Sequence, residues 1–479
     1  MKSRTLILYV TFFLLSFSVI QTKAVTSDTV KIVILSLNDQ HAKIDNYGHL
    51  KAALDEIRSK NNDVLLFAAG DNFTGNPIVD QYVDKGFPII DLMNTVGFNA
   101  TAIGNHEFDY GQETLGRRIE QASFPFLNSN IKDESGNPKY KPYHIFKLNN
   151  GIRVAVISAI QLGTDGTPDS HPSNLKGLFF NDGISELLKY KNLRDSCDIF
   201  IALTHIGFEE DIKLAEQMPQ LDLILGGHTH TLTKPSHLVN GINILQAGSN
   251  VRNLSKTTIY IVNGKAVKIT PEMLDLTKYK PGDPEIENKL RLFNDNKELN
   301  KVIGKTSGMH GSDELGSMMT DAVTSLKEVD VAFQNNGGIR IDMLEQGDIS
   351  VKDVYKLDPF GNEVILISMS PKEIKSLILN AYIQAGNSID LQVSGLTYTV
   401  ITDQNNKAGN VELKWPDGKK VKKCKKINVG LNSYIASSYK FDHKDPGKSL
   451  YITTAETLIN YIKSQKDINY KGVKRAFVK

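Results

Sequence analysis

The stretch Gly104-Asn105-His106-Glu107-Phe108-Asp109 is the most informative part of the sequence. It follows a short apolar run, Ala100–Ile103, and is therefore expected to form the turn that leaves a buried strand. Such a turn can present an amide, an imidazole and a carboxylate to one space. Asn105 can then ligate a metal ion, while His106, held by Asp109, acts on a charged oxygen beside it. The alternative is that His106 caps the following helix and Asp109 pairs locally.

Other apolar runs end in the same kind of polar segment. Apolar runs and amphipathic helical stretches, such as Ile78–Val96 and Gly183–Leu193, alternate from Val30 to about Ile269, which is typical of layered α/β proteins. Ligands in such proteins bind beyond the carboxyl ends of the strands. We therefore expect five strand ends to meet at one place, carrying Asn38-Asp39-Gln40-His41, Gly70-Asp71-Asn72, Gly104-Asn105-His106, His205, and Gly226-Gly227-His228-Thr229-His230.

The candidate metal ligands are nitrogen and oxygen donors only: Asp39, His41, Asp71, Asn105, His205, His228 and His230. Donors of this kind without thiolate favour zinc, manganese, iron or cobalt over an iron–sulfur or structural zinc site. Seven ligands are too many for one tetrahedral ion and suffice for two ions if one carboxylate bridges them. Asp71, on a Gly-Asp turn, is the natural bridge. Two metal ions about 3.5–4 Å apart lower the pKa of a shared water and clamp the oxygens of a phosphoryl group.

These motifs together resemble the calcineurin-like metallophosphoesterases, and among them the secreted two-domain 5′-nucleotidases. The resemblance implies an α/β fold, a four-layer α-β-β-α sandwich, followed by an α+β substrate-binding domain. It implies two divalent metal ions, one held by Asp39, His41, Asp71 and His230 and the other by Asp71, Asn105, His205 and His228. The implied reaction is hydrolysis of nucleoside 5′-monophosphates by a metal-bridging hydroxide. His106 would assist departure of the sugar oxygen, and Asp109 would orient its imidazole.

The second half of the chain resembles the substrate domain of that family. Asn335-Asn336-Gly337-Gly338-Ile339-Arg340 resembles a loop whose arginine meets phosphate and whose asparagine reads the base. Phe360 and Tyr434 stand where the family has two aromatic residues that stack on the base. The implied substrate contacts are thus Asn335, Gly337, Arg340, Phe360 and Tyr434. The structural alternative is that the glycines form only a turn and that Phe360 belongs to the core.

Three positions of the second half depart from the family pattern. Ser438-Tyr439-Lys440 stands where the family usually has Gly-Gly-Asp, whose aspartate binds ribose hydroxyls. His310 stands near the place of a usual arginine, and the usual asparagine before Leu315-Gly316 is missing. The substrate therefore stays open among nucleoside monophosphates, 2′,3′-cyclic nucleotides, nucleotide sugars and other phosphate esters. A non-catalytic surface binding protein is an alternative of a different class, which the complete ligand set disfavours.

The N-terminus predicts export from the cytoplasm. Lys2 and Arg4 precede the apolar run Thr5–Ile20, and Thr22-Lys23-Ala24 supplies a small-x-small cleavage site. The run is shorter than the roughly 20 residues of a spanning helix, so residues 1–24 are interpreted as a signal peptide rather than an uncleaved anchor. The mature protein is then periplasmic or extracellular, without a stable membrane span. We expect a catalytic domain over residues 25–273, a helical linker or one more surface helix over 274–301, and a substrate domain over 302–479.

Charge and cysteine content limit the partners. Removal of residues 1–24 takes away three basic residues and no acidic ones, so the formal charge changes from +2 to −1. The mature chain therefore lacks the broad basic field that nucleic-acid binding needs, and a small phosphate ester is the expected partner. Cys197 and Cys424 are the only cysteines and are expected to be isolated thiols, with one disulfide between them as the alternative. The oligomeric state stays open.

Overall fold

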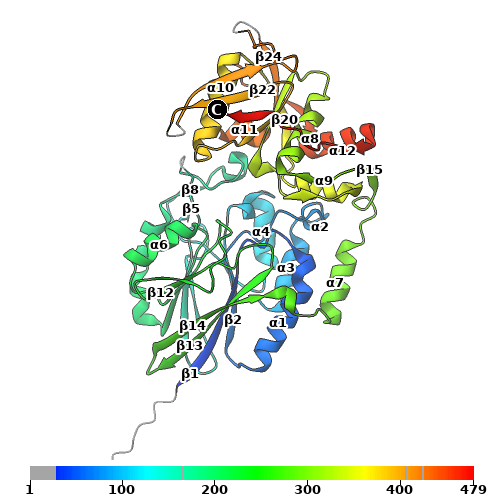
Figure 1. The fold of residues 1–479 in the computed structure, drawn as a ribbon. Helices are drawn as coiled ribbons and strands as arrows, with labels where there is room; N and C mark the ends of the chain where they lie inside the picture. The colour runs from blue at the N-terminus through cyan, green and yellow to red at the C-terminus, as the bar shows by residue number, and fades with distance from the viewer. Residues whose placement is uncertain (1–28, 164–165, 405–406, 423–425) are drawn as a thin grey trace, which may run out of the picture.

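The protein is described by a computed structural model, in which two domains follow each other along the chain (Figure 1). It describes residues 29–163, 166–404, 407–422 and 426–479. The predicted signal peptide and Cys424 lie outside these residues, and Cys197 is a buried free thiol. Within the described ranges, the structure contains no helix with the length and apolar character of a membrane span.

Two six-stranded sheets form the centre of the first domain. The first sheet has the order β14-β13-β1-β2-β3-β4, with bounds Lys265–Asp275, Asn253–Val262, Val30–Leu37, Val64–Ala68, Ala100–Ala102 and Phe126–Leu127. The second has the order β11-β12-β10-β9-β7-β6, with bounds His237–Val239, Ile242–Leu245, Leu223–Leu225, Ile199–Leu203, Arg153–Ile157 and Tyr143–Lys147. Strands β1 to β4 are parallel, as are β7, β9, β10 and β12, so their carboxyl ends share an edge.

The apolar side chains build four layers. Strand β1 buries Ile32 and Ile34 between the two sheets, while Val33 and Leu35 pack on the other face with the helices. Burial of both faces explains why the strands are continuous apolar runs. Helices α1 (Tyr47–Ser59), α3 (Phe87–Val96) and α4 (Gln112–Gln121) contribute to the core outside the first sheet, and α5 (Gly183–Leu188) and α6 (Phe208–Gln217) to the core outside the second. The predicted α-β-β-α sandwich is confirmed.

Two predicted helices are shorter in the structure. The stretch Ile78–Val96 is divided between α2 (Pro77–Asp80) and α3, with a break between them in which Gly86 has φ 78°. A residue at this positive φ does not continue a right-handed helix, and Pro88 then fits the first turn of α3. The stretch Gly183–Leu193 contains α5, and a 3-10 helix, η4 (Lys191–Ser196), follows it.

The segment between the domains packs on the first domain. Helix α7 (Pro284–Asn294) begins at Asp283, whose carboxylate accepts hydrogen bonds from the first backbone N–H groups. Ile286 is fully buried in the core that includes α1 and α3. Phe293 contacts the ring of Phe87 at 6.4 Å between centroids. Helix α7 therefore packs against helices of the first domain.

The second domain is built on the sheet β21-β17-β24-β20-β25. Its bounds are Leu391–Ser394, Val331–Asn335, Ile427–Asn432, Glu363–Met369 and Lys448–Thr453. Val331 and Phe333 pack in a core with α10 (Pro371–Gln384), while Ala332 packs with Val323 of α8 (Ser312–Thr324). Smaller sheets, β19-β15-β26 and β23-β22-β27, and helix α12 (Thr454–Gln465) complete the α+β domain.

Candidate active site

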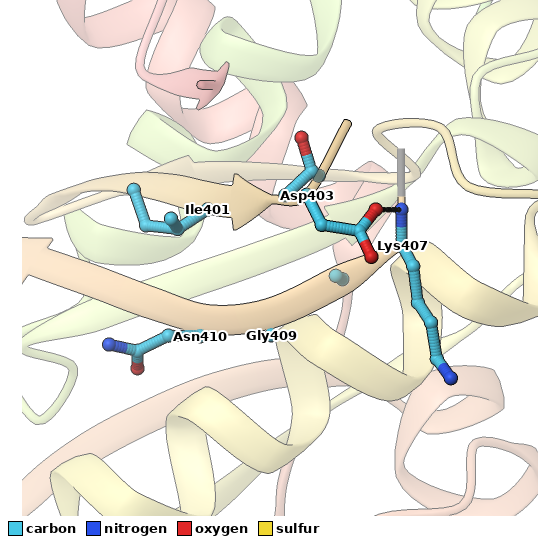
Figure 2. Close-up of a pocket in the computed structure, with 7 residues that line it drawn as sticks. Ile401, Asp403, Lys407, Gly409 and Asn410 are labelled. Carbon is cyan, nitrogen blue, oxygen red and sulfur yellow. Dashed lines mark hydrogen bonds between the residues drawn. The ribbon is translucent and has the colours of Figure 1, made fainter. Parts of the chain in front are cut away.

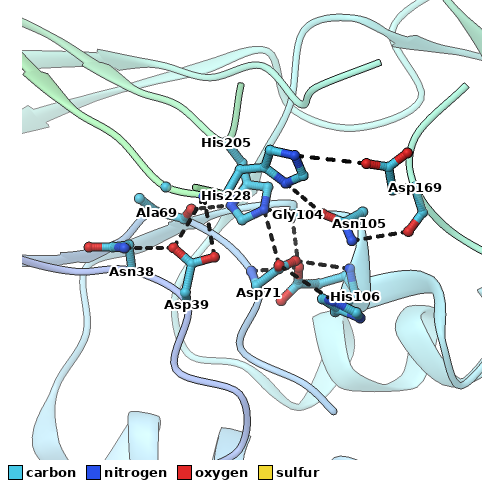
Figure 3. A network of polar contacts seen from close by, with 12 residues as sticks. Asn38, Asp39, Ala69, Asp71, Gly104, Asn105, His106, Asp169, His205 and His228 are labelled. Carbon is cyan, nitrogen blue, oxygen red and sulfur yellow. Dashed lines mark hydrogen bonds and ion pairs between the residues drawn. The ribbon is translucent and has the colours of Figure 1, made fainter. Parts of the chain in front are cut away.

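The five strand ends meet at the carboxyl edge of the two sheets (Figure 3). His205 Nε2 lies 3.2 Å from Asp71 Oδ2 and 3.3 Å from Asn105 Oδ1. His228 Nδ1 lies 3.1 Å from the same Asn105 oxygen. These four side chains, which follow four different strands, form one compact group of donors.

A second group lies beside the first. His41 Nε2 is 3.0 Å from His230 Nε2, which is 3.3 Å from Asp39 Oδ1. The donor atoms of Asp71, His41 and His106 also lie within 4.8 Å of one another, so Asp71 lies between the two groups. Two imidazole nitrogens and a carboxylate oxygen that converge in this way leave lone pairs directed at one point. This donor set fits a divalent cation, and the Asp71 carboxylate can ligate two cations at once.

The backbone of the candidate ligands is unusual. Five of the seven have a positive φ, between 45° and 80°: Asp39, His41, Asp71, His228 and His230. A side chain in this region costs on the order of 1–3 kcal/mol and persists only where the surrounding structure imposes it. Such strain gathers at functional sites, and here it directs the side chains of three strand ends into one space.

Glu107 holds the strand end that carries Asp71. It is fully buried, and Oε2 accepts hydrogen bonds from the N–H groups of Asp71 (3.0 Å) and Gly104 (2.7 Å). Its Oε1 accepts from the backbone and side chain of Asn72. Burial and then the charge of Asp71 raise the pKa of Glu107 to about 7. Glu107 therefore fastens the end of β2 to that of β3.

The electrostatics of the centre favour bound positive charge. Burial by itself raises the pKa of Asp71, but the His205 and His106 imidazoles lower it well below its ordinary value. Conversely, burial is the largest single effect on His205 and lowers its pKa. The charge and hydrogen bond of Asp71, the charge of Asp39 and the Ala69 carbonyl together outweigh burial and raise the pKa to about 10. A proton on His205 thus balances Asp71 in the metal-free protein. A divalent cation at the same place supplies that charge directly.

His106 and Asp109 form the predicted pair. Asp109 Oδ2 lies 2.7 Å from His106 Nδ1, so Nδ1 carries the proton that the carboxylate accepts. His106 Nε2 then faces the centre, 4.0 Å from Asp71 Oδ2. The backbone N–H of His106 also donates to Asp71 Oδ1 at 2.9 Å. The imidazole is therefore oriented toward a group bound at Asp71.

The second domain reaches this centre with two of the predicted substrate residues. The ring of Phe360 stacks on His106, with 5.8 Å between centroids and 23° between planes. The guanidinium of Arg340 lies over the Phe360 ring, 5.5 Å from its centroid. Its charge is close enough to lower the pKa of His41, after burial and His106. Arg340 therefore brings positive charge to the metal centre.

The remaining predicted substrate residues make contacts within the second domain. Asn335 is buried at the end of β17, where its Oδ1 accepts a hydrogen bond from Asn432 at 3.0 Å. Gly337 is exposed in η6 (Asn336–Gly338). The Tyr434 ring contacts Tyr439 at 6.2 Å. Of the five predicted substrate residues, the structure thus brings Arg340 and Phe360 to the His106–Asp109 pair, which we call the dyad.

Two further polar residues that support the site were not singled out from the sequence. Asn38 Nδ2 donates to Asp39 Oδ2 at 2.6 Å and to the Gly248 carbonyl. Gln246 accepts from Thr231 N at 3.1 Å and donates to the Gly227 carbonyl at 3.1 Å. Asn38 belongs to the strand-end motif Asn38-Asp39-Gln40-His41, although it was not among the candidate ligands. Gln246 follows β12 without any motif, and only the path of the chain reveals its role.

A separate shallow pocket of about 360 Å³ lies on the hairpin of β22 (Thr397–Thr402) and β23 (Ala408–Lys414) (Figure 2). There the Lys407 backbone N–H donates to the Asp403 carboxylate at 2.9 Å. None of the predicted site residues lines this pocket.

Two family patterns match the chain at positions that agree with this geometry. The pattern described as calcineurin-like phosphoesterase matches residues 24–232, and the 5′-nucleotidase C-terminal domain matches residues 297–440. The chain belongs to the two-domain 5′-nucleotidase family. It is accordingly a metal-dependent phosphoester hydrolase.

Relatives of this 5′-nucleotidase family member include enzymes of several bacteria. A 5′-nucleotidase of Vibrio cholerae is 27% identical, and the match covers 92% of each of the two chains. The trifunctional nucleotide phosphoesterase protein YfkN of Bacillus subtilis is 28% identical. The match covers 81% of this chain and 30% of that relative's length. A 5′-nucleotidase precursor from Thermus thermophilus has the same fold, with a TM-score of 0.81 at 24% identity over 94% of this chain and 99% of its own.

The positions that depart from the 5′-nucleotidase pattern have different surroundings. His310 is fully buried, and its Nε2 lies 2.9 Å from Thr306 Oγ1, so it belongs to the interior of the second domain. Lys440 is exposed. Tyr439 donates its hydroxyl proton to Asp390 at 2.5 Å, and Asp390 also accepts from the backbone N–H of Asn336. The carboxylate of Asp390, which directly precedes β21, thus lies beside the predicted substrate loop.

Proposed function

We propose that this phosphoester hydrolase acts on nucleoside 5′-monophosphates and releases nucleoside and phosphate. The observation that carries the proposal is the convergence of seven donors around Asp71, next to the His106–Asp109 pair and to Arg340 of the second domain. The family relation supports a nucleotide as the substrate, because the named relatives include a 5′-nucleotidase.

The arrangement of the donors supports two divalent ions. Asp39, His41 and His230 would hold one, Asn105, His205 and His228 the other, and Asp71 both. Zinc, manganese, iron and cobalt all suit such a set. When bound, the ions supply Lewis-acid activation of water and neutralise phosphate charge.

The protein's own residues would orient the ester and handle its protons. Arg340 binds phosphate oxygens through its planar guanidinium. His106 Nε2, oriented by Asp109, donates a hydrogen bond or a proton to the oxygen that leaves phosphorus. Phe360 offers a flat face to the base, next to the dyad. We also infer that the protein works outside the cytoplasmic membrane, supported by the predicted signal peptide.

The test is phosphate release from AMP by the purified protein after chelation and after addition of Mn²⁺ or Zn²⁺. We expect activity that chelation abolishes and the metal restores. A rate of phosphate release that neither chelation nor added metal changes would contradict the proposal. A panel with 2′,3′-cyclic AMP, a nucleotide sugar and glycerol 3-phosphate measures the preference, and we expect the highest kcat/KM for AMP. A clear preference for another ester would contradict the proposed substrate and would leave the proposed metal site standing.

A further inference from the structure

We propose that Asp169 is a positioning residue for the second metal site, where it orients the Asn105 amide and the His228 imidazole. The inference rests on the proposed function, because both partners are ligands of that site. Asp169 belongs to the segment between β7 and β8 (Phe179–Phe180), which carries none of the five strand-end motifs. Figure 3 shows it facing both ligands from the side opposite Asp39.

The backbone carbonyl of Asp169 fixes the Asn105 amide. Asn105 Nδ2 donates to this carbonyl at 3.1 Å. A carbonyl accepts only from the NH₂ end of an amide, so the bond directs Asn105 Oδ1 toward His205 and His228, at 3.3 and 3.1 Å. Only the amide oxygen can ligate a cation. A rotated amide would present N–H donors to the metal.

The carboxylate of Asp169 faces the other ligand. His228 Nδ1 is the ring nitrogen near Asn105, and Nε2 lies 3.9 Å from Asp169 Oδ2. A carboxylate beside Nε2 keeps the proton there and leaves the Nδ1 lone pair for a cation. The separation exceeds a hydrogen bond by about 1 Å. The Asp169 side chain is 53% exposed.

The same device recurs at two other ligands. His41 Nδ1 lies 3.1 Å from the Thr74 carbonyl, and His205 Nδ1 lies 2.7 Å from the Ala69 carbonyl. In each ring, the nitrogen that faces away from the metal centre has an oxygen acceptor. At His228 the carboxylate of Asp169 takes that place.

The local backbone holds Asp169 in this orientation. Ser170 N donates to the Pro168 carbonyl at 2.7 Å, which closes a tight turn centred on Asp169. Further along, Gln112 Nε2 donates to the Asn174 carbonyl at 3.0 Å and ties the segment to the start of α4. The segment is thus attached to the same element that follows the catalytic dyad.

The test compares Asp169→Ala and Asp169→Asn with Asp195→Asn, an exposed aspartate of η4 that serves as the control. Metal-free protein is titrated with Mn²⁺ by calorimetry. We expect two sites in the wild type and the control. In Asp169→Ala, the affinity of one site falls by about ten- to a hundredfold, as is common for residues that support metal ligands. Asp169→Asn loses less, because its amide oxygen still accepts from Nε2.

A second readout separates positioning from general structural support. The kcat for AMP of both variants should fall at limiting Mn²⁺ and recover at excess Mn²⁺, since filled sites restore the ligand geometry. Asp169→Ala keeps the backbone carbonyl, so two sites of wild-type affinity in this variant would overturn the role of the Asp169 carboxylate at His228 and leave the proposed function intact. A loss of kcat that excess Mn²⁺ does not recover would overturn it too. A wild type that binds no second ion would contradict the proposed function as well.

Discussion

His106 shows at the scale of one residue how the site is tuned. Burial by itself lowers its pKa, but Asp109 and Asp71 raise it above the ordinary value. The protonated form therefore persists to higher pH, as a proton donor to the leaving oxygen requires. The hydrogen bond to Asp109 also fixes which ring nitrogen faces the substrate.

Asp109→Asn should lower kcat for AMP and change its pH dependence. The substitution removes the largest interaction that raises the pKa of His106. The imidazole then loses its proton at lower pH, so the alkaline limb of kcat moves to lower pH. We expect kcat to fall by about a hundredfold at its optimum. The measurement is a pH–rate profile at saturating Mn²⁺, and an unshifted limb would contradict the role given to Asp109.

Glu107→Gln should destabilise the first domain. If the NH₂ group takes the place of Oε2, the backbone N–H groups of Asp71 and Gly104 face a donor. If it takes the place of Oε1, the backbone N–H and the side-chain amide of Asn72 do. We expect the free energy of unfolding at pH 8 to fall by about 2 kcal/mol or more. Urea denaturation with chelator present measures this, and Glu113→Gln, on the exposed face of α4, is the control. Equal stability of the two variants would show that Glu107 does not fasten these strand ends.

At the scale of elements, the segment between α9 (Val351–Leu357) and β20 connects the two functional halves, because it places Phe360 on the dyad. Phe360→Ala should raise KM for AMP by about tenfold, the range expected for loss of one base-stacking contact. The KM for glycerol 3-phosphate, which has no base, should change little. Tyr451→Ala, an exposed aromatic residue of the same domain, is the control. Equal increases in KM for both substrates would mean that Phe360 acts through His106 instead.

The elements also explain what could be predicted from sequence. Each metal motif directly follows an apolar strand, and parallel strands align their carboxyl ends, so Asp71, Asn105 and His205 could be placed together in advance. The contacts of Asp169 and Gln246 depend on the paths of loops, which no periodicity encodes. The placement of Phe360 on His106 depends on how the second domain meets the first, and strand patterns do not contain that information.

On the scale of the whole molecule, metal binding should stabilise one domain selectively. All seven candidate ligands belong to the first domain, and Arg340 comes from the second. A ligand at 100 times its Kd stabilises a fold by about 2.7 kcal/mol. Chelation should therefore lower the Tm of the first domain's unfolding transition and leave that of the second unchanged. Differential scanning calorimetry with and without Mn²⁺ measures both, and a shift confined to the second transition would contradict the assignment.

The most direct test of the dimetal centre is anomalous diffraction from crystals of the protein grown with Mn²⁺. The donor geometry predicts two peaks that share Asp71, one enclosed by Asp39, His41 and His230 and the other by Asn105, His205 and His228. A lack of peaks at Asp71, or metal bound only elsewhere on the molecule, would contradict the account.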